Sequence, residues 1–132
     1  MSTRRKFLVS ASTLALAASL PALSASQKEK QVLVHHVFFW LKNPSSKEDL
    51  AKLIEGVTSL KKIESLRMAK IGVPANTTKR DVIDDSYSLS LLTAFDDVKG
   101  HDIYQDHPIH TKFVDTYSPL WNKVVVYDSM DL

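Results

Sequence analysis

The sequence predicts a single α+β domain in which helices cover one face of an antiparallel sheet, with the element order β-α-β-β-α-β. Its 132 residues fit one ordinary domain. Four segments are rich in β-branched and aromatic residues, and two others repeat apolar residues at helical spacing. The second and third strand-like segments follow each other without a helix between them, so the order divides into two β-α-β halves.

The first strand is predicted over Val32–Leu41, where β-branched and aromatic residues occupy both alternating faces. This pattern is typical of a strand buried on two sides. His35 and His36 are neighbours in it, so their side chains point to opposite faces of the sheet. Only one of them can therefore enter a given cavity.

The first helix is predicted to start directly after Pro44. Ser45 with Glu48 can form a capping box at its start. The alternative is Ser46 with Asp49. One apolar stripe then recurs at helical spacing, at Leu50, Leu53, Ile54, Val57 and Leu60.

Two further strands are predicted over Leu66–Val73 and Tyr87–Phe95, and Pro74 closes the first of them. The second has one clearly apolar face. The polar stretch Ala75–Asp85 between them is typical of a loop. Its acidic residues are expected to be solvated and without function, because their spacing does not match a calcium-binding loop. They are Asp81, Asp84 and Asp85.

The second helical region is predicted to be divided. Asp96 or Asp97 can cap a segment that continues to about Gln105. A new helical start follows at His107-Pro108, because proline is favoured in a first turn. Pro119 is expected to end or kink this second segment.

The last strand is predicted over Val124–Tyr127. The complete order is that of ferredoxin-like folds, in which helices cover one face of an antiparallel sheet. The other face then lacks a cover. A second copy of the chain would bury it, so we expect a homodimer that closes two sheets into a barrel.

Residues 1–25 have the organisation of a bacterial signal peptide. A basic start is followed by the apolar stretch Phe7–Leu20 and then by small residues, so cleavage is expected after Ser24 or Ala25. The pair Arg4 and Arg5 resembles the motif read by the twin-arginine export machinery. We therefore expect a periplasmic or secreted protein, with residues 26–31 as a polar linker to a domain over residues 32–130.

Composition excludes several classes of protein. Cysteine is absent, which excludes disulfides, thiolate nucleophiles and zinc–thiolate sites. The three glycines lie far apart, so they cannot form a phosphate-binding loop. Without residues 1–25 the chain has 14 basic and 15 acidic residues, and no basic face is expected to bind nucleic acid.

Histidine and tyrosine carry the candidate chemistry. Tyr104, His107 and His110 follow one another at spacings of three residues. Imidazole exchanges protons near neutral pH, and a phenol can donate a hydrogen bond to a developing oxyanion. The alternative is that this segment only caps a helix and packs. A metal site at His107 and His110 is disfavoured because their surroundings in the sequence are not rich in Glu and Asp and contain no zinc-protease motif.

Three segments together resemble the stress-responsive dimeric α/β barrel (Dabb) family over Val32–Met130. They are the first-strand pattern His35-Val37-Phe38-Phe39-Lys42, the segment Tyr104-x-x-His107-Pro108-x-His110, and the end Val124-Val125-Val126-Tyr127-Asp128. The resemblance implies a ferredoxin-like homodimer without cofactor or metal. The family includes a plant cyclase that forms olivetolic acid by an intramolecular aldol condensation, although most members have no assigned reaction.

The same resemblance implies roles for individual residues. His110 would abstract a proton beside a carbonyl, Tyr104 would stabilise the enolate oxygen, and Asp128 would hold the His110 tautomer. His35 and His107 would bind substrate. His107 lies at the bend between the two helical segments, and its main role is predicted to be capping the second one.

Two functions from different classes follow. The first is an exported enzyme that performs acid–base chemistry on a small apolar carbonyl or phenolic compound. The second is a small-molecule-binding or stress-response module that uses the same barrel without turnover. A haem- or oxygen-handling relative is a third alternative.

Overall fold

A computed structural model describes residues 31–132. The predicted signal peptide with Arg4 and Arg5, and the predicted linker up to residue 30, lie outside the described residues. Among residues 31–132, no helix is long and apolar enough to cross a membrane.

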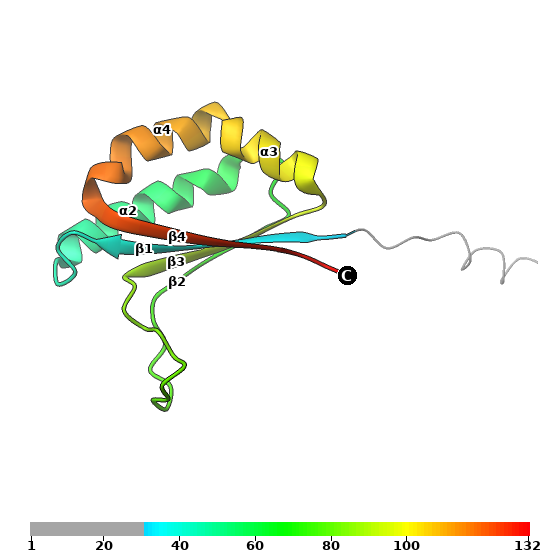
Figure 1. Ribbon diagram of the computed structural model, residues 1–132. Coiled ribbons are helices and arrows are strands. Elements are labelled where there is room, and N and C mark those ends of the chain that lie inside the picture. Colours follow the sequence, from blue (N-terminus) through cyan, green and yellow to red (C-terminus); the bar gives the residue numbers. More distant parts are fainter. Residues whose placement is uncertain (1–30) are drawn as a thin grey trace, which may run out of the picture.

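In the described part of the chain, four antiparallel strands form one sheet in the order β2-β3-β1-β4. The strands are β1 (Leu33–Leu41), β2 (Met68–Gly72), β3 (Leu89–Phe95) and β4 (Trp121–Met130). β1 lies in the interior of the sheet and pairs with β4 along its whole length. The helices lie on one face of this sheet, while the segment between β2 and β3 projects beyond the other (Figure 1). The predicted ferredoxin-like α+β fold is confirmed.

Within residues 31–132, three helices cover the sheet, namely α2 (Lys47–Ser59), α3 (Val98–Asp106) and α4 (Pro108–Tyr117). Their starts follow from local chemistry. The Ser46 hydroxyl accepts a hydrogen bond from the Asp49 amide at 3.0 Å, so the second of the two predicted caps is the one that forms. Asp97 caps α3 through the Gly100 amide at 2.8 Å.

The ends of the predicted helices also agree with the structure. α4 stops at Tyr117, one residue before the short 3₁₀ turn Ser118–Leu120 that contains Pro119. A similar 3₁₀ turn, Leu60–Lys62, follows α2. α2 and α4 approach closely where Gly56 faces Tyr117, because a Cβ atom at Gly56 would lie 2.7 Å from the tyrosine ring. The ring occupies the space that a side chain would fill.

The last strand is much longer than predicted. It runs over Trp121–Met130 instead of Val124–Tyr127, because pairing with β1 extends it through polar positions such as Asp128. β2 and β3 are shorter than the predicted Leu66–Val73 and Tyr87–Phe95. Tertiary pairing, which the apolar pattern does not record, sets these bounds.

The two faces of β1 differ in burial within this chain, although the sequence pattern predicts a strand buried on two sides. Side chains of Leu33, His35, Val37, Phe39 and Leu41 are buried beneath the helices. The alternating positions, His36 among them, are only half-buried. Within residues 31–132, the helices cover one face of the sheet and leave the other, with its half-buried apolar side chains, uncovered.

Candidate functional site

A cavity of about 190 Å³ lies between the sheet and helices α3 and α4. Most of its wall is apolar, and its polar members are His35, Tyr104, Gln105 and His110. Apolar cavities of about 150 Å³ hold a benzene molecule, so this cavity has room for one aromatic ring or a short branched chain. A few polar groups in an apolar pocket are typical of small-molecule sites.

His35 and Asp128 form the polar pair at the sheet. They lie directly opposite each other on β1 and β4, and His35 Nδ1 is 2.5 Å from Asp128 Oδ1. The His35 backbone carbonyl accepts a hydrogen bond from the Thr93 hydroxyl at 2.8 Å, which fixes the strand on its other side. The His35 ring is thereby held in one orientation beside the cavity.

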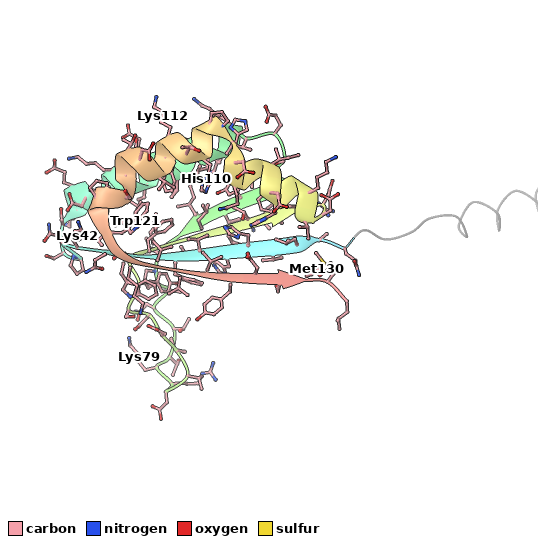
Figure 2. The ribbon with its side chains drawn as sticks, turned by 45° about the horizontal axis from the view of Figure 1, so that its top comes forward. Lys42, Lys79, His110, Lys112, Trp121 and Met130 are labelled. Carbon is pink, nitrogen blue, oxygen red and sulfur yellow. The ribbon has the colours of Figure 1, made fainter. Side chains whose placement is uncertain are left out.

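Tyr104 and His110 come from the two helical segments that meet at the bend. Their ring centroids are 4.9 Å apart in an edge-to-face contact. Tyr104 is 1% exposed, and its ring also lies 6.1 Å from that of His35. Figure 2 shows His110 on the side of α4 that faces the sheet, whereas Lys112 lies on the outer side. Three of the predicted site residues, His35, Tyr104 and His110, therefore line one cavity.

Burial sets the protonation of these groups. The pKa of His110 is lowered, first by desolvation and then by the nearby imidazoles of His35 and His101. Burial raises the pKa of the Tyr104 phenol. Near neutral pH the site therefore presents a neutral imidazole, which can accept a proton, beside a protonated phenol, which can donate a hydrogen bond.

Asp128 lies elsewhere than the resemblance implied. It was expected to hold the tautomer of His110, but its side chain contacts His35. The reason is the strand register, which sets Asp128 directly across from His35. The orientation of His110 instead depends on its ring contacts with Tyr104 and Phe113.

His107 lies outside the cavity lining, so its expected contact with substrate has no support in its position. It forms the predicted helix cap, because its Nδ1 accepts a hydrogen bond from the Ile109 amide at 3.1 Å. Its Nε2 lies 3.6 Å from the Glu64 carboxylate. Both ring nitrogens thus face groups of the protein.

His101 was not predicted and belongs to the same cluster. Its ring centroid is 4.9 Å from that of His35, and its Nδ1 lies 3.1 Å from Asp102 Oδ1. Its Nε2 is buried without a hydrogen-bond partner. Its place in the site could have been predicted from the sequence, because His101 precedes Tyr104 by three residues on a helix and so shares its face.

Two of the three acidic loop residues, Asp84 and Asp85, contact residues of the segment between β2 and β3, as expected for a solvated segment. Asp85 is paired with Lys79 at 2.5 Å, and Asp84 accepts a hydrogen bond from the Ser86 amide at 3.0 Å. Lys79 lies in the projecting segment between β2 and β3 (Figure 2). No residue of this loop lines the cavity.

The family model of the stress responsive A/B barrel domain (Dabb) matches residues 33–131. The chain therefore belongs to the Dabb family. A search of curated protein sequences gave no match.

Solved structures agree on the fold. A Dabb protein with a ferredoxin-like fold from Mesorhizobium loti is 24% identical, with a TM-score of 0.63 over 78% of this chain and 99% of the other. A dimeric ferredoxin-like protein of unknown function from Thermobifida fusca is 17% identical, with a TM-score of 0.61 over 79% and 94% of the chains. A hydroxynitrile lyase from Passiflora edulis is 18% identical, with a TM-score of 0.65 over 78% and 95%.

Proposed function

We propose that this Dabb protein is an enzyme that uses acid–base chemistry on a small, mainly apolar carbonyl compound. The observation that carries the proposal is the meeting of His110 and Tyr104, with ring centroids 4.9 Å apart, in an apolar cavity large enough for one aromatic ring. The hydroxynitrile lyase among the similar structures supports it, because that protein has the same fold and is an enzyme. Fold alone does not assign a reaction, so the proposal rests on the site.

The proposed reaction is proton abstraction beside the carbonyl group. A neutral imidazole nitrogen of His110 takes the proton, and the electron pair of the broken C–H bond moves to the carbonyl oxygen to form an enolate. The Tyr104 hydroxyl donates a hydrogen bond to that oxygen while its charge develops. The apolar wall excludes water and strengthens this hydrogen bond.

Deuterium exchange tests this step without knowledge of the natural substrate. Small aryl methyl ketones such as acetophenone are incubated with the protein in D₂O, and deuterium in the methyl group is followed by NMR. We expect wild-type protein to accelerate exchange and His110→Ala to reduce it by about 10² to 10⁴. Tyr104→Phe should reduce it by about 10² to 10³.

His36→Ala is the matched control, because His36 lies on the opposite face of the same strand and should leave exchange unchanged. Equal rates in wild-type protein and His110→Ala would contradict the proposal. Saturable ketone binding with no exchange in any variant would instead favour the binding module.

We also propose that the precursor is exported through the twin-arginine route, on the motif Arg4-Arg5 followed by Phe7-Leu8. Replacement of both arginines by lysine should leave the precursor in the cytoplasm of a bacterial host, which fractionation and immunoblotting would detect. Unchanged export would contradict this route.

A further inference from the structure

We propose that His35, His101 and Asp128 form a binding site for a divalent first-row transition-metal ion. The three residues come from β1, α3 and β4, and one ligand atom of each lies within 4.8 Å of the other two. This inference goes beyond the proposed acid–base function and does not depend on it, because neither His110 nor Tyr104 is a ligand.

The state of the His101 ring is the first argument. Its Nδ1 faces the Asp102 carboxylate at 3.1 Å, while its Nε2 is buried and has no partner. A carboxylate that accepts the Nδ1 proton leaves the lone pair of the neutral ring on Nε2. Histidines that bind metals in proteins commonly have this arrangement, in which a carboxylate orients the ring from behind.

The pair of His35 and Asp128 supplies the other two ligands. A hydrogen shared between His35 Nδ1 and Asp128 Oδ1 now joins them at 2.5 Å. A metal ion bound by both atoms would take the place of that hydrogen. The His35 side chain is 8% exposed and that of Asp128 is 49% exposed, so an ion can enter from the solvent side at the edge strand β4.

The ligand set determines the class of ion. Two imidazoles and one carboxylate suit Zn²⁺, Co²⁺ or Ni²⁺, whereas Mg²⁺ and Ca²⁺ prefer oxygen ligands. Bonds to such ions are about 2.0–2.2 Å, so tetrahedral ligand atoms lie roughly 3.3 Å apart. His35 Nδ1 and Asp128 Oδ1 must therefore separate from their present 2.5 Å, while the His101 ligand atom, within 4.8 Å of both, must come to that spacing. Asp128 can make this movement because its side chain is half-exposed. Three protein ligands leave a coordination position open to water or to an oxygen of a bound molecule.

Titration of the untagged full-length chain with Co²⁺ and Zn²⁺ tests the site directly. The chain has no cysteine and only five histidines, so binding by nitrogen ligands can be traced to single residues. We expect one ion per chain by calorimetry and a visible Co²⁺ absorption band that Zn²⁺ abolishes. His101→Ala should weaken binding by at least about tenfold. Mg²⁺ should produce no heat of binding at the same concentration.

Two histidine variants serve as matched controls. His36→Ala removes an imidazole on the opposite face of the sheet, and His110→Ala removes one inside the cavity but outside the ligand set. Both should keep the Co²⁺ band. If His101→Ala fails to fold, Asp128→Asn carries the test, because its half-exposed side chain can change without disturbing the core. Failure of wild-type protein to bind either ion, or equal affinity in His101→Ala and His36→Ala, would overturn the proposal.

Discussion

The two faces of the sheet carry the same residue types but place them in different surroundings. His35, on the helix-covered face, is 6% exposed and contacts Asp128. The adjacent His36, on the open face, lies against Phe38 with ring centroids 4.3 Å apart. The alternation of side chains along one strand thus separates a histidine at the candidate site from one on an aromatic surface. Residue type alone does not distinguish them.

The open face is unusually aromatic for a surface in contact with water. Phe38 contacts Tyr87 and Tyr127 with centroid distances of 4.9 and 6.0 Å, and Tyr127 is 66% exposed. Large exposed apolar patches generally mark sites of protein association. Several similar structures are dimeric. We propose that a second copy of this chain covers the open face.

Neighbouring phenylalanines on β1 give the largest expected contrast between the faces. Phe39 is 3% exposed beneath the helices, whereas Phe38 lies on the open face. Phe39→Ala should lower the free energy of unfolding by about 3–5 kcal/mol, because it leaves a cavity in the core. Chemical denaturation at fixed protein concentration measures this change.

Phe38→Ala is the paired variant and should act mainly on association. We expect sedimentation experiments to show a dimer for wild-type protein and a shift toward monomer for Phe38→Ala. A wild-type protein that stays monomeric at micromolar concentration would contradict the proposed dimer. If Phe39→Ala and Phe38→Ala lower the free energy of unfolding equally and neither changes the mass measured by sedimentation, the proposed difference between the two faces is contradicted.

The His107 cap gives a smaller effect that is separate from the site. His107→Ala removes the acceptor of the Ile109 amide at the start of α4. Loss of such a cap costs about 0.5–2 kcal/mol of the free energy of unfolding, which thermal or chemical denaturation would detect. We expect ketone deuterium exchange to persist in this variant. Loss of exchange at unchanged stability would instead show that His107 acts in the site.

The pH dependence of stability gives the smallest effect and involves both faces. Burial lowers the pKa of His36 and, together with the charges of His35 and His101, that of His110 from its ordinary value of 6.5. On acidification, the unfolded chain therefore binds protons at a higher pH than the folded chain does. Stability should be greatest above pH 6.5 and fall as the pH decreases toward the folded pKa values.

Denaturation at a series of pH values between 5 and 8 measures this dependence. His110→Gln should flatten the decrease more than His36→Gln, because desolvation and the charges of His35 and His101 all lower the pKa of His110, whereas desolvation alone lowers that of His36. A stability that is constant over this range, or that rises on acidification, would contradict the assignment of neutral buried imidazoles.

The sequence predicted the elements well where local chemistry defines them. Ser46, Asp97 and the bend at His107-Pro108 mark helix starts that the structure contains, because caps and prolines act within a few residues. The prediction from the sequence was wrong for the ends of β4, because pairing with β1 extends that strand through Asp128 and other polar positions. Strand length depends on a partner far away in the sequence.

The contacts within the candidate site were predicted correctly only where its residues are close together in the sequence. Tyr104 and His110 are close in sequence, so their approach followed from the bend between two helices. The contact of Asp128 with His35 depends on register across 93 residues, and the position of His101 depends on how α3 lies over β1. The expected absence of a metal rested on His107 and His110, on the spacing of the acidic loop residues and on the family resemblance. None of these considered the cluster of His35, His101 and Asp128.

Binding of a small ketone, followed at individual imidazoles, tests most directly whether the helix-covered cavity is the site. Acetophenone is titrated into wild-type protein, and the ring signals of the five histidines, assigned with single variants, are recorded by NMR. We predict saturable shifts of the His110 and His35 signals with one ketone per chain, and an unchanged His36 signal. Shifts confined to His36, or no saturable shift at His110, would contradict the account.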